Sequence, residues 1–110
     1  MALTELKTAD FDRFIASHPL VVIEFSAEWC APCQDFKQVL LNLQPEFPDF
    51  QFATVDIDSE TELAQEFEVR SVPATLIIKE GTIVLAESGA LSATVFRDLL
   101  TQARVMPAAD

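Results

Sequence analysis

The sequence predicts an α/β protein with a central mixed sheet of about five strands and helices on both of its faces. Apolar runs typical of buried strands alternate with segments whose apolar residues recur at helical spacing. The resulting order is β-α-β-α-β-α-β-β-α, so early βαβ units make part of the sheet parallel and a late hairpin makes part of it antiparallel. Half of the 110 residues are hydrophobic and only two are Gly, which is enough apolar material for one domain over residues 1–110.

The first elements are a short strand, a helix and a strong strand. Residues 3–6 can form the short strand. Thr8 can cap a helix that reaches about Ser17, before Pro19. The apolar residues of this helix share one face, namely Phe11, Phe14 and Ile15. Leu20–Ser26 is apolar on both faces, as expected of a central parallel strand, although it contains a Glu.

The middle of the chain repeats this alternation. A long helix is expected over about residues 30–47, because its apolar residues recur at helical spacing. These residues are Phe36, Val39, Leu40, Leu43 and Phe47. Residues 50–57 form a second strong strand. Ser59 and Glu62 match a capping box that would open a short helix to about Phe67.

The last part of the chain predicts a hairpin followed by a helix. The strands Ala74–Lys79 and 83–87 are joined by a turn in which Gly81 suits a hairpin. Ser92 caps a final helix that ends where a frayed tail over 104–110 begins. This helix offers four apolar residues to the core, namely Val95, Phe96, Leu99 and Leu100.

Charge and composition exclude several classes of function. The net charge of −11 would repel nucleic acid and anionic membranes. No apolar run approaches the roughly 20 residues of a membrane-spanning helix, and the first residues lack the pattern of a secretory signal. We therefore expect a cytoplasmic monomer in a reducing compartment, where a close cysteine pair is more often catalytic or metal-binding than structural.

Acidic residues are concentrated in one stretch of the chain. Residues 38–69 contain eight Asp or Glu and no Lys or Arg. This pattern predicts a solvated face that keeps the protein soluble. Selection of basic partners is the alternative interpretation.

The only two cysteines, Cys30 and Cys33, stand at the start of the predicted long helix. Unpaired backbone N–H groups and the helix dipole favour a thiolate at Cys30. Cys33, one turn further on, is placed to resolve a mixed disulfide. Pro32 offers neither an N–H nor a positive charge to the thiolate, which favours a reductant. The alternatives are two inert core cysteines, or a metal or iron–sulfur cluster bridged by two chains, because one chain lacks a convincing set of zinc ligands.

Three segments of the sequence resemble the thioredoxin family. "AEWCAPC" resembles the active site, whose usual form has Gly in place of Ala31. "VRSVPATLIIKEG" resembles the cis-proline segment, and "SGALS" resembles the late glycine loop. The predicted order of elements matches the whole thioredoxin fold, so the resemblance covers nearly the full chain.

The resemblance implies a protein-disulfide reductase that needs no bound cofactor and no metal. Cys30 would attack the substrate disulfide and Cys33 would resolve the intermediate. Pro73 would follow a cis peptide bond beside the two sulfurs, and the backbone of Val72 would pair with an extended substrate. The remaining substrate-binding residues are Trp29, Pro32, Ser71, Gly89 and Ala90. Electrons would come from a thioredoxin reductase and leave to oxidised protein substrates.

Glu24 stands six residues before Cys30, where thioredoxins commonly keep a buried Asp. That acid is thought to move protons to and from the inner cysteine, and burial raises a carboxyl pKa toward neutrality. Thr54 stands where many members have a Lys, which removes a charge that would lower the pKa of the acid. The alternatives are a carboxylate at an exposed strand edge for Glu24 and an ordinary trans loop proline for Pro73.

Two other functions stay open at this point. The domain can be a binding or chaperone-like module that holds partners on the surface around Trp29 and Pro73, with regulatory thiols. Replacing both cysteines by Ser distinguishes the two, because a binding module would keep its partners and its biological effect, whereas a reductase would lose turnover. An oxidase or isomerase of an oxidising compartment is the third option, against which Pro32 and the absence of a secretory signal both argue.

Overall fold

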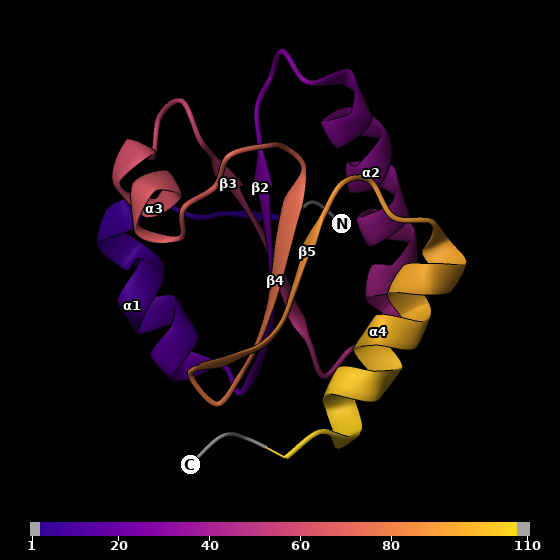
Figure 1. Cartoon of the computed structure of the whole chain (residues 1–110). Helices are drawn as coiled ribbons and strands as arrows, with labels where there is room; N and C mark the ends of the chain where they lie inside the picture. Colours follow the sequence, from indigo (N-terminus) through magenta and orange to yellow (C-terminus); the bar gives the residue numbers. More distant parts are fainter. Residues whose placement is uncertain (1–2, 108–110) are drawn as a thin grey trace.

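The computed structural model describes residues 3–107, which form a five-stranded sheet between two pairs of helices (Figure 1). The strands are β1 (Thr4–Glu5), β2 (Leu20–Ser26), β3 (Gln51–Asp56), β4 (Ala74–Lys79) and β5 (Thr82–Ser88). The helices are α1 (Thr8–Ser17), α2 (Ala31–Leu43), α3 (Thr61–Glu66) and α4 (Ala93–Val105), and a 3-10 turn, η1 (Gln44–Glu46), follows α2. This element order confirms the predicted fold class.

Strand β2 lies in the middle of the sheet. The strand order is β1-β3-β2-β4-β5. Strands β1 and β2 are both parallel to β3, whereas β4 is antiparallel to β2 and β5. Glu24 is therefore flanked by Thr54 of β3 on one side and Thr75 of β4 on the other. The alternative of a strand-edge carboxylate is wrong.

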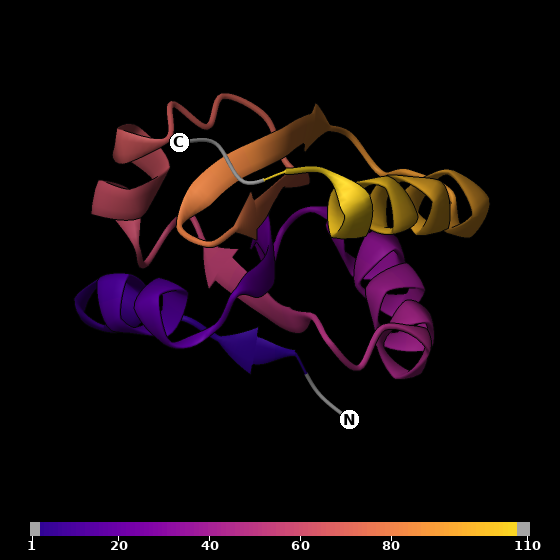
Figure 2. The same ribbon diagram turned by 90° about the horizontal axis from the view of Figure 1, so that it is seen from below.

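The two helix pairs bury opposite faces of the sheet. Figures 1 and 2 show α1 and α3 on one face and α2 and α4 on the other. Because successive side chains of a strand point to opposite faces, β2 contributes to both cores. Val21, Ile23 and Phe25 pack in the core under α1 and α3. Val22 packs in the core under α2 and α4, with Phe36.

The start of α1 is held by a distant carboxylate rather than by Thr8. Thr8 is the first residue of the helix, and Lys7, at the cap position, makes no side-chain cap. The backbone N–H and the hydroxyl of Thr8 donate to Glu60 Oε1 at 2.9 and 3.1 Å. The capping box predicted at Ser59 is also wrong, because α3 begins after Glu60 without a side-chain cap. The backbone N–H of Thr8 is the main reason that the pKa of Glu60 lies below its usual value.

The C-terminal hairpin has the predicted turn. Glu80 and Gly81 have φ angles of 49° and 81°, the left-handed pair that a two-residue type I′ hairpin turn requires. Strands β4 and β5 are paired up to Lys79 and Thr82 on either side of this turn.

Helix α4 agrees with the sequence at its start and departs from it at its end. The Ser92 hydroxyl accepts the Val95 N–H at 3.2 Å, which confirms the predicted cap. The prediction that Val95 belongs to the core is wrong, because its side chain is 47% exposed. Arg104 and Val105 are helical rather than part of a frayed tail, and Lys79 Nζ donates to the Arg104 carbonyl at 2.8 Å. Met106 and Pro107 follow the helix as the predicted tail does, and the remaining residues of that tail, 108–110, lie outside the described residues.

Over residues 3–107, no helix combines the length and the apolar character that crossing a bilayer requires.

Candidate active site

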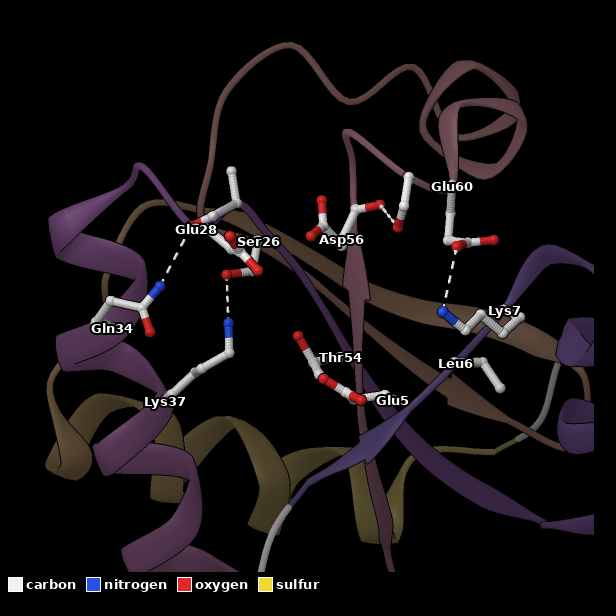
Figure 3. A pocket seen from close by; sticks show the side chains of 12 residues that line it. Glu5, Leu6, Lys7, Ser26, Glu28, Gln34, Lys37, Thr54, Asp56 and Glu60 are labelled. Atoms are coloured by element: carbon white, nitrogen blue, oxygen red, sulfur yellow. Dashed lines mark hydrogen bonds and ion pairs between the residues drawn. The ribbon is translucent and has the colours of Figure 1, made fainter.

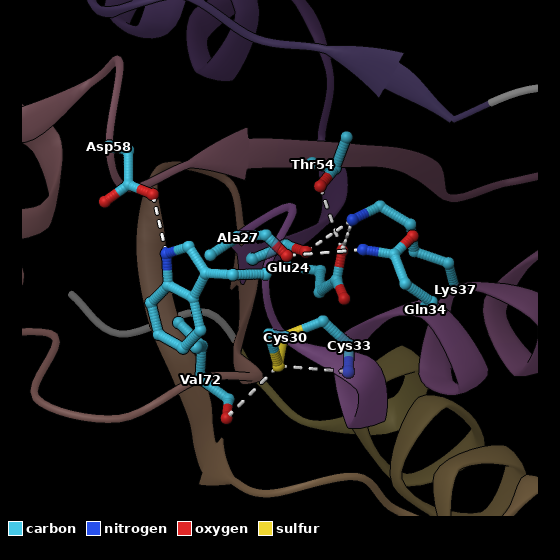
Figure 4. Close-up of a disulfide and its surroundings, with 11 residues drawn as sticks. Glu24, Ala27, Cys30, Cys33, Gln34, Lys37, Thr54, Asp58 and Val72 are labelled. Carbon is cyan, nitrogen blue, oxygen red and sulfur yellow. Dashed lines mark hydrogen bonds and ion pairs between the residues drawn. A yellow bond between two sulfur atoms is a disulfide. The ribbon is translucent and has the colours of Figure 1, made fainter.

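The cysteine pair lies where β2 passes into α2. Cys30 occupies the N-cap position of α2, and its Sγ accepts the backbone N–H of Cys33 at 3.1 Å. The two residues form a disulfide with their Cα atoms 5.3 Å apart (Figure 4). Cys30 is 5% exposed, whereas Cys33 is fully buried. The N–H donor and the helix dipole both favour a thiolate at Cys30 in the reduced protein, as the sequence predicts.

Pro73 and the late glycine loop complete the surroundings of Cys30. The Val72–Pro73 peptide bond is cis, which confirms the cis bond predicted before Pro73. Cys30 Sγ lies 3.8 Å from the carbonyl oxygen of Val72. The Gly89 N–H donates to the Pro73 carbonyl at 2.8 Å, so the two segments are tied together. Their chain neighbours Ser71 and Ala90 are exposed.

Trp29 is the largest exposed apolar side chain next to the cysteines. It is 69% exposed. Its indole Nε1–H donates to Asp58 Oδ2 at 2.8 Å, which fixes the orientation of the ring (Figure 4). Pro32 is exposed in the first turn of α2. The sequence analysis missed Asp58, because the acidic stretch over 38–69 does not single out one carboxylate.

Glu24 is fully buried, and its two carboxylate oxygens have different environments. Oε1 accepts the Thr54 hydroxyl at 2.9 Å and lies 3.5 Å from Lys37 Nζ. Within residues 3–107, Oε2 has no hydrogen-bonding partner, and neither has the buried hydroxyl of Thr75. Figure 4 shows the carboxylate between Lys37 and Thr54 on one side and Cys33 on the other.

Burial is the main influence on the acidity of Glu24. Desolvation raises the pKa of this carboxyl above its usual value. The charge of Lys37 and the hydrogen bond from Thr54 lower it, but they offset only part of the burial effect. A raised pKa suits a carboxyl that must take up and release a proton near neutral pH.

Lys37 adds a charge that the sequence analysis did not consider. Thr54 takes the place of the Lys that many members have in β3, but Lys37 of α2 brings a cation to the same carboxylate. Lys37 Nζ also donates to Ser26 Oγ. The sequence did contain a signal, because Lys37 follows Cys33 by four residues and so lies on the same side of the helix. That signal is meaningful only once α2 is known to pack over Glu24.

Over the described part of the chain, no three His, Cys, Asp or Glu side chains are grouped so that they could hold a metal ion.

Comparison with known proteins agrees with this geometry. The family model described as Thioredoxin matches residues 2–102. The chain belongs to the thioredoxin family. It is 35% identical over 94 residues to Thioredoxin-1 of Saccharomyces cerevisiae, covering 84% of this chain and 91% of that protein. Thioredoxins catalyse the reduction of protein disulfides, and the Cys30–Cys33 pair makes this chain a dithiol–disulfide oxidoreductase.

Solved thioredoxin structures have the same fold. The structure of Fasciola hepatica thioredoxin superimposes with a TM-score of 0.85 at 33% identity, covering 91% of this chain and 98% of that one. The oxidised form of mitochondrial Thioredoxin 3 from Saccharomyces cerevisiae has a TM-score of 0.84 at 29% identity, covering 91% and 94%. These thioredoxins share the fold over nearly the whole chain.

Proposed function

We propose that Cys30 is the nucleophile and Cys33 the resolving thiol of this member of the thioredoxin family, which acts as a reductant of disulfide bonds in proteins. The observation that carries the proposal is the asymmetry of the pair. Cys30 Sγ receives a backbone N–H at the start of α2 and is the partly exposed sulfur, whereas Cys33 is fully buried. A substrate disulfide can therefore reach only Cys30.

The reaction transfers two electrons from the dithiol to the substrate. The Cys30 thiolate attacks one substrate sulfur, the substrate S–S bond breaks, and the other substrate sulfur leaves as a thiolate that takes a proton from water. Cys33 then loses its proton, and its thiolate attacks Cys30 Sγ. The Cys30–Cys33 disulfide forms, and the second substrate sulfur leaves as a thiolate and is protonated in turn.

The substrate would dock on the surface around Cys30. Trp29 offers an exposed aromatic ring that Asp58 holds in place. The half-buried Val72 places its carbonyl oxygen 3.8 Å from Cys30 Sγ, so an extended substrate strand could pair with this backbone next to the nucleophile. The other members of this proposed substrate surface are Pro32, Ser71, Pro73, Gly89 and Ala90.

Glu24 would accept the proton of Cys33. Its Oε2 has no protein partner among residues 3–107. It faces the side of Cys33 in Figure 4. A buried carboxylate with one free oxygen can take a proton directly or through a water molecule.

We also propose the setting in which this chemistry runs. The oxidised protein would be returned to the dithiol by a thioredoxin reductase, so that electrons flow through it to oxidised proteins and maintain cell redox homeostasis. It would work as a monomer in the cytoplasm.

Trapping of the covalent intermediate tests the proposal. Reduced Cys33→Ser protein, incubated with a disulfide-containing protein such as insulin, should accumulate a mixed disulfide through Cys30. Cys30→Ser should accumulate none. Trapping by Cys30→Ser instead would reverse the assigned roles. If the variant with both cysteines replaced by Ser kept the biological effect of the wild type as well as its partners, the protein would be a binding module rather than a reductase.

A further inference from the structure

A buried proton acceptor needs a route to solvent. The proposed function, on which this inference rests, has Glu24 take the Cys33 proton in every turnover. Glu24 is fully buried, and during the reaction the substrate covers the surface around Cys30. The proton must therefore leave on another side of the carboxylate.

A cavity of about 400 Å³ lies on such a side, between β1, β3 and the start of α2 (Figure 3). Lys37, Ser26 and Thr54 all line this β1–α2 cavity. None of the described residues that line it belongs to the proposed substrate surface. Glu28, Asp56 and Ser59 border both this cavity and Trp29. A protein docked on Trp29 and Val72 would reach that edge and leave the part of the cavity lined by Glu5, Lys37 and Thr54 open to water.

Every contact that holds Glu24 Oε1 comes from the lining of this cavity. Thr54 donates to Oε1 at 2.9 Å, and Lys37 Nζ lies 3.5 Å from it. Lys37 is also fixed by Ser26 Oγ. The Lys37 side chain is 26% exposed while that of Glu24 is 0% exposed, so Lys37 spans the distance from the buried carboxylate to the solvent in the cavity.

We propose that Lys37 is a positioning residue for proton transfer, which holds ionised Glu24 with Oε1 toward the β1–α2 cavity, and that Glu24 exchanges its proton with solvent through this cavity. Cys33 gives its proton to the free Oε2. Rotation about the terminal torsion of Glu, which is broad and roughly two-fold, then exchanges the two oxygens. Water in the cavity takes the proton, and Lys37 again pairs with the carboxylate charge.

Lys37 is the only cation within 4 Å of Glu24 among the described residues. Lys37 of α2 and Thr54 of β3 contact Glu24 directly. Thr75 of β4 pairs with it across the sheet, Cys33 of α2 lies on its other side in Figure 4, and Ser26 of β2 is held by Lys37. The other charged residues of the cavity lining are Glu5, Lys7, Glu28, Asp56 and Glu60. Lys7 pairs with Glu60 at 3.9 Å, so it carries the same charge in the same cavity without touching Glu24. It therefore provides a matched control.

The test is the pH profile of the resolving step. Reduced protein mixed with an aromatic disulfide releases one coloured thiol when Cys30 attacks and a second when Cys33 resolves. Lys37→Gln removes the charge that favours the carboxylate, so less Glu24 is available as a base near neutrality. The second phase should slow about tenfold at pH 7 and its profile should move to higher pH. The first phase should change little.

Four further variants sharpen this result. Lys37→Arg keeps a charge at the site and should keep the wild-type profile, and Lys7→Gln should leave the profile in place. Thr54→Lys, added to Lys37→Gln, brings a cation to Oε1 from β3 and should restore the profile. In a Glu24→Gln background, Lys37→Gln should have no further effect on the second phase. The shift should be equally large when insulin replaces the aromatic disulfide.

Several outcomes would overturn the inference. One is an unchanged profile in folded Lys37→Gln, and another is an equal shift in Lys7→Gln. A shift that persists in the Glu24→Gln background would contradict the role of the carboxylate. A shift that disappears with the protein substrate would contradict the separate proton route. If wild-type protein showed no second phase at all, the proposed function itself would fail, which is a different result from a second phase insensitive to Lys37.

Discussion

The two sides of strand β2 have opposite characters although both are buried. Val21, Ile23 and Phe25 face α1 and α3 and are apolar throughout. On the other side, the sequence changes from Val22 to Glu24 and Ser26 toward the end of the strand from which the chain continues to Cys30. One side of the strand therefore contributes only to the core. The other side changes, within five residues, from a core side chain to the polar side chains of the candidate active site.

This contrast teaches where a carboxylate can be buried. An isolated charge in an apolar interior is very costly, and the cost falls only when donors and a counter-ion are supplied. Glu24 has both because β3 brings Thr54 and α2 brings Lys37. The compensation is incomplete, because Oε2 stays without a partner among the described residues. This side would therefore give up stability for the proton transfer proposed above.

The largest effect on stability is expected on the apolar side. Ile23→Ala removes a fully buried side chain from the core under α1 and α3. It should lower the free energy of unfolding by about 2–5 kcal/mol, measured by urea unfolding. Reduction of insulin should keep most of its rate at a temperature where the variant is folded. A loss below about 1 kcal/mol would contradict the assignment of this side to the core.

Glu24→Gln should raise the free energy of unfolding, in contrast to Ile23→Ala, and the size of this gain should depend on pH. Because the pKa of Glu24 is raised in the folded protein, the native state binds more protons than the unfolded chain from about pH 4.3 up to that raised pKa. Wild-type stability therefore falls as pH rises through this window. The variant lacks this fall and should be more stable at pH 8 by about 1–3 kcal/mol.

Urea unfolding of both oxidised proteins at pH 4 and pH 8 checks this prediction. The difference should become small at pH 4, where Glu24 is largely protonated in both states. A variant that is less stable than wild type at pH 8 would show that the Lys37 ion pair outweighs the burial of the charge.

A smaller effect on stability is expected at Asp49, and its pH dependence should be opposite to that of Glu24. Arg104 makes two hydrogen bonds of 2.8 Å to this exposed carboxylate, and they hold the pKa of Asp49 below its usual value. The pair therefore stabilises the protein above the usual pKa of Asp, and this contribution is lost as pH falls through the lowered pKa. Thermal unfolding of Arg104→Met should show a small loss at pH 7, reduced further by salt. An equal loss at pH 2 would exclude the ion pair as its cause.

The smallest effect on stability is expected at Trp29, because its side chain is largely exposed. Trp29→Ala should change the free energy of unfolding by less than about 0.5 kcal/mol. It should raise the KM for insulin several-fold, since an exposed and oriented aromatic ring is typical of a binding surface. Asp58→Asn, which weakens the acceptor of the indole N–H, is the milder matched variant. Unchanged KM values in both variants would remove Trp29 from the proposed substrate surface.

Much of the fold and of the site follows from local patterns. The strands and helices, the cap at Ser92 and the turn at Gly81 depend on nearby residues, and so the sequence predicts them. The position of Cys30 at the start of α2 and the cis bond before Pro73 were predicted for different reasons, the first from helix spacing and the second from family resemblance.

Two of the missed features depend on tertiary contacts, and a third depends on which face of a helix is buried. Glu60 holds the start of α1 from 52 residues away. Val95 has a core-like side chain, but it precedes Phe96 by one residue and so points about 100° away from the face that Phe96 and Leu100 bury. Lys37 reaches Glu24 only because α2 packs across β2. For Glu60 and Lys37 the residue type was visible in the sequence, whereas the neighbour that gives each its role comes from another element.

The equilibrium reduction potential of the Cys30–Cys33 pair tests the central claim, that this dithiol is a reductant, most directly. Cys30 Sγ accepts the Cys33 N–H, and Pro32 adds no donor or charge that would stabilise its thiolate further. We predict a potential near that of thioredoxin, about −270 mV, in a defined dithiol buffer. A value close to that of the strong oxidant DsbA, about −120 mV, would contradict the account.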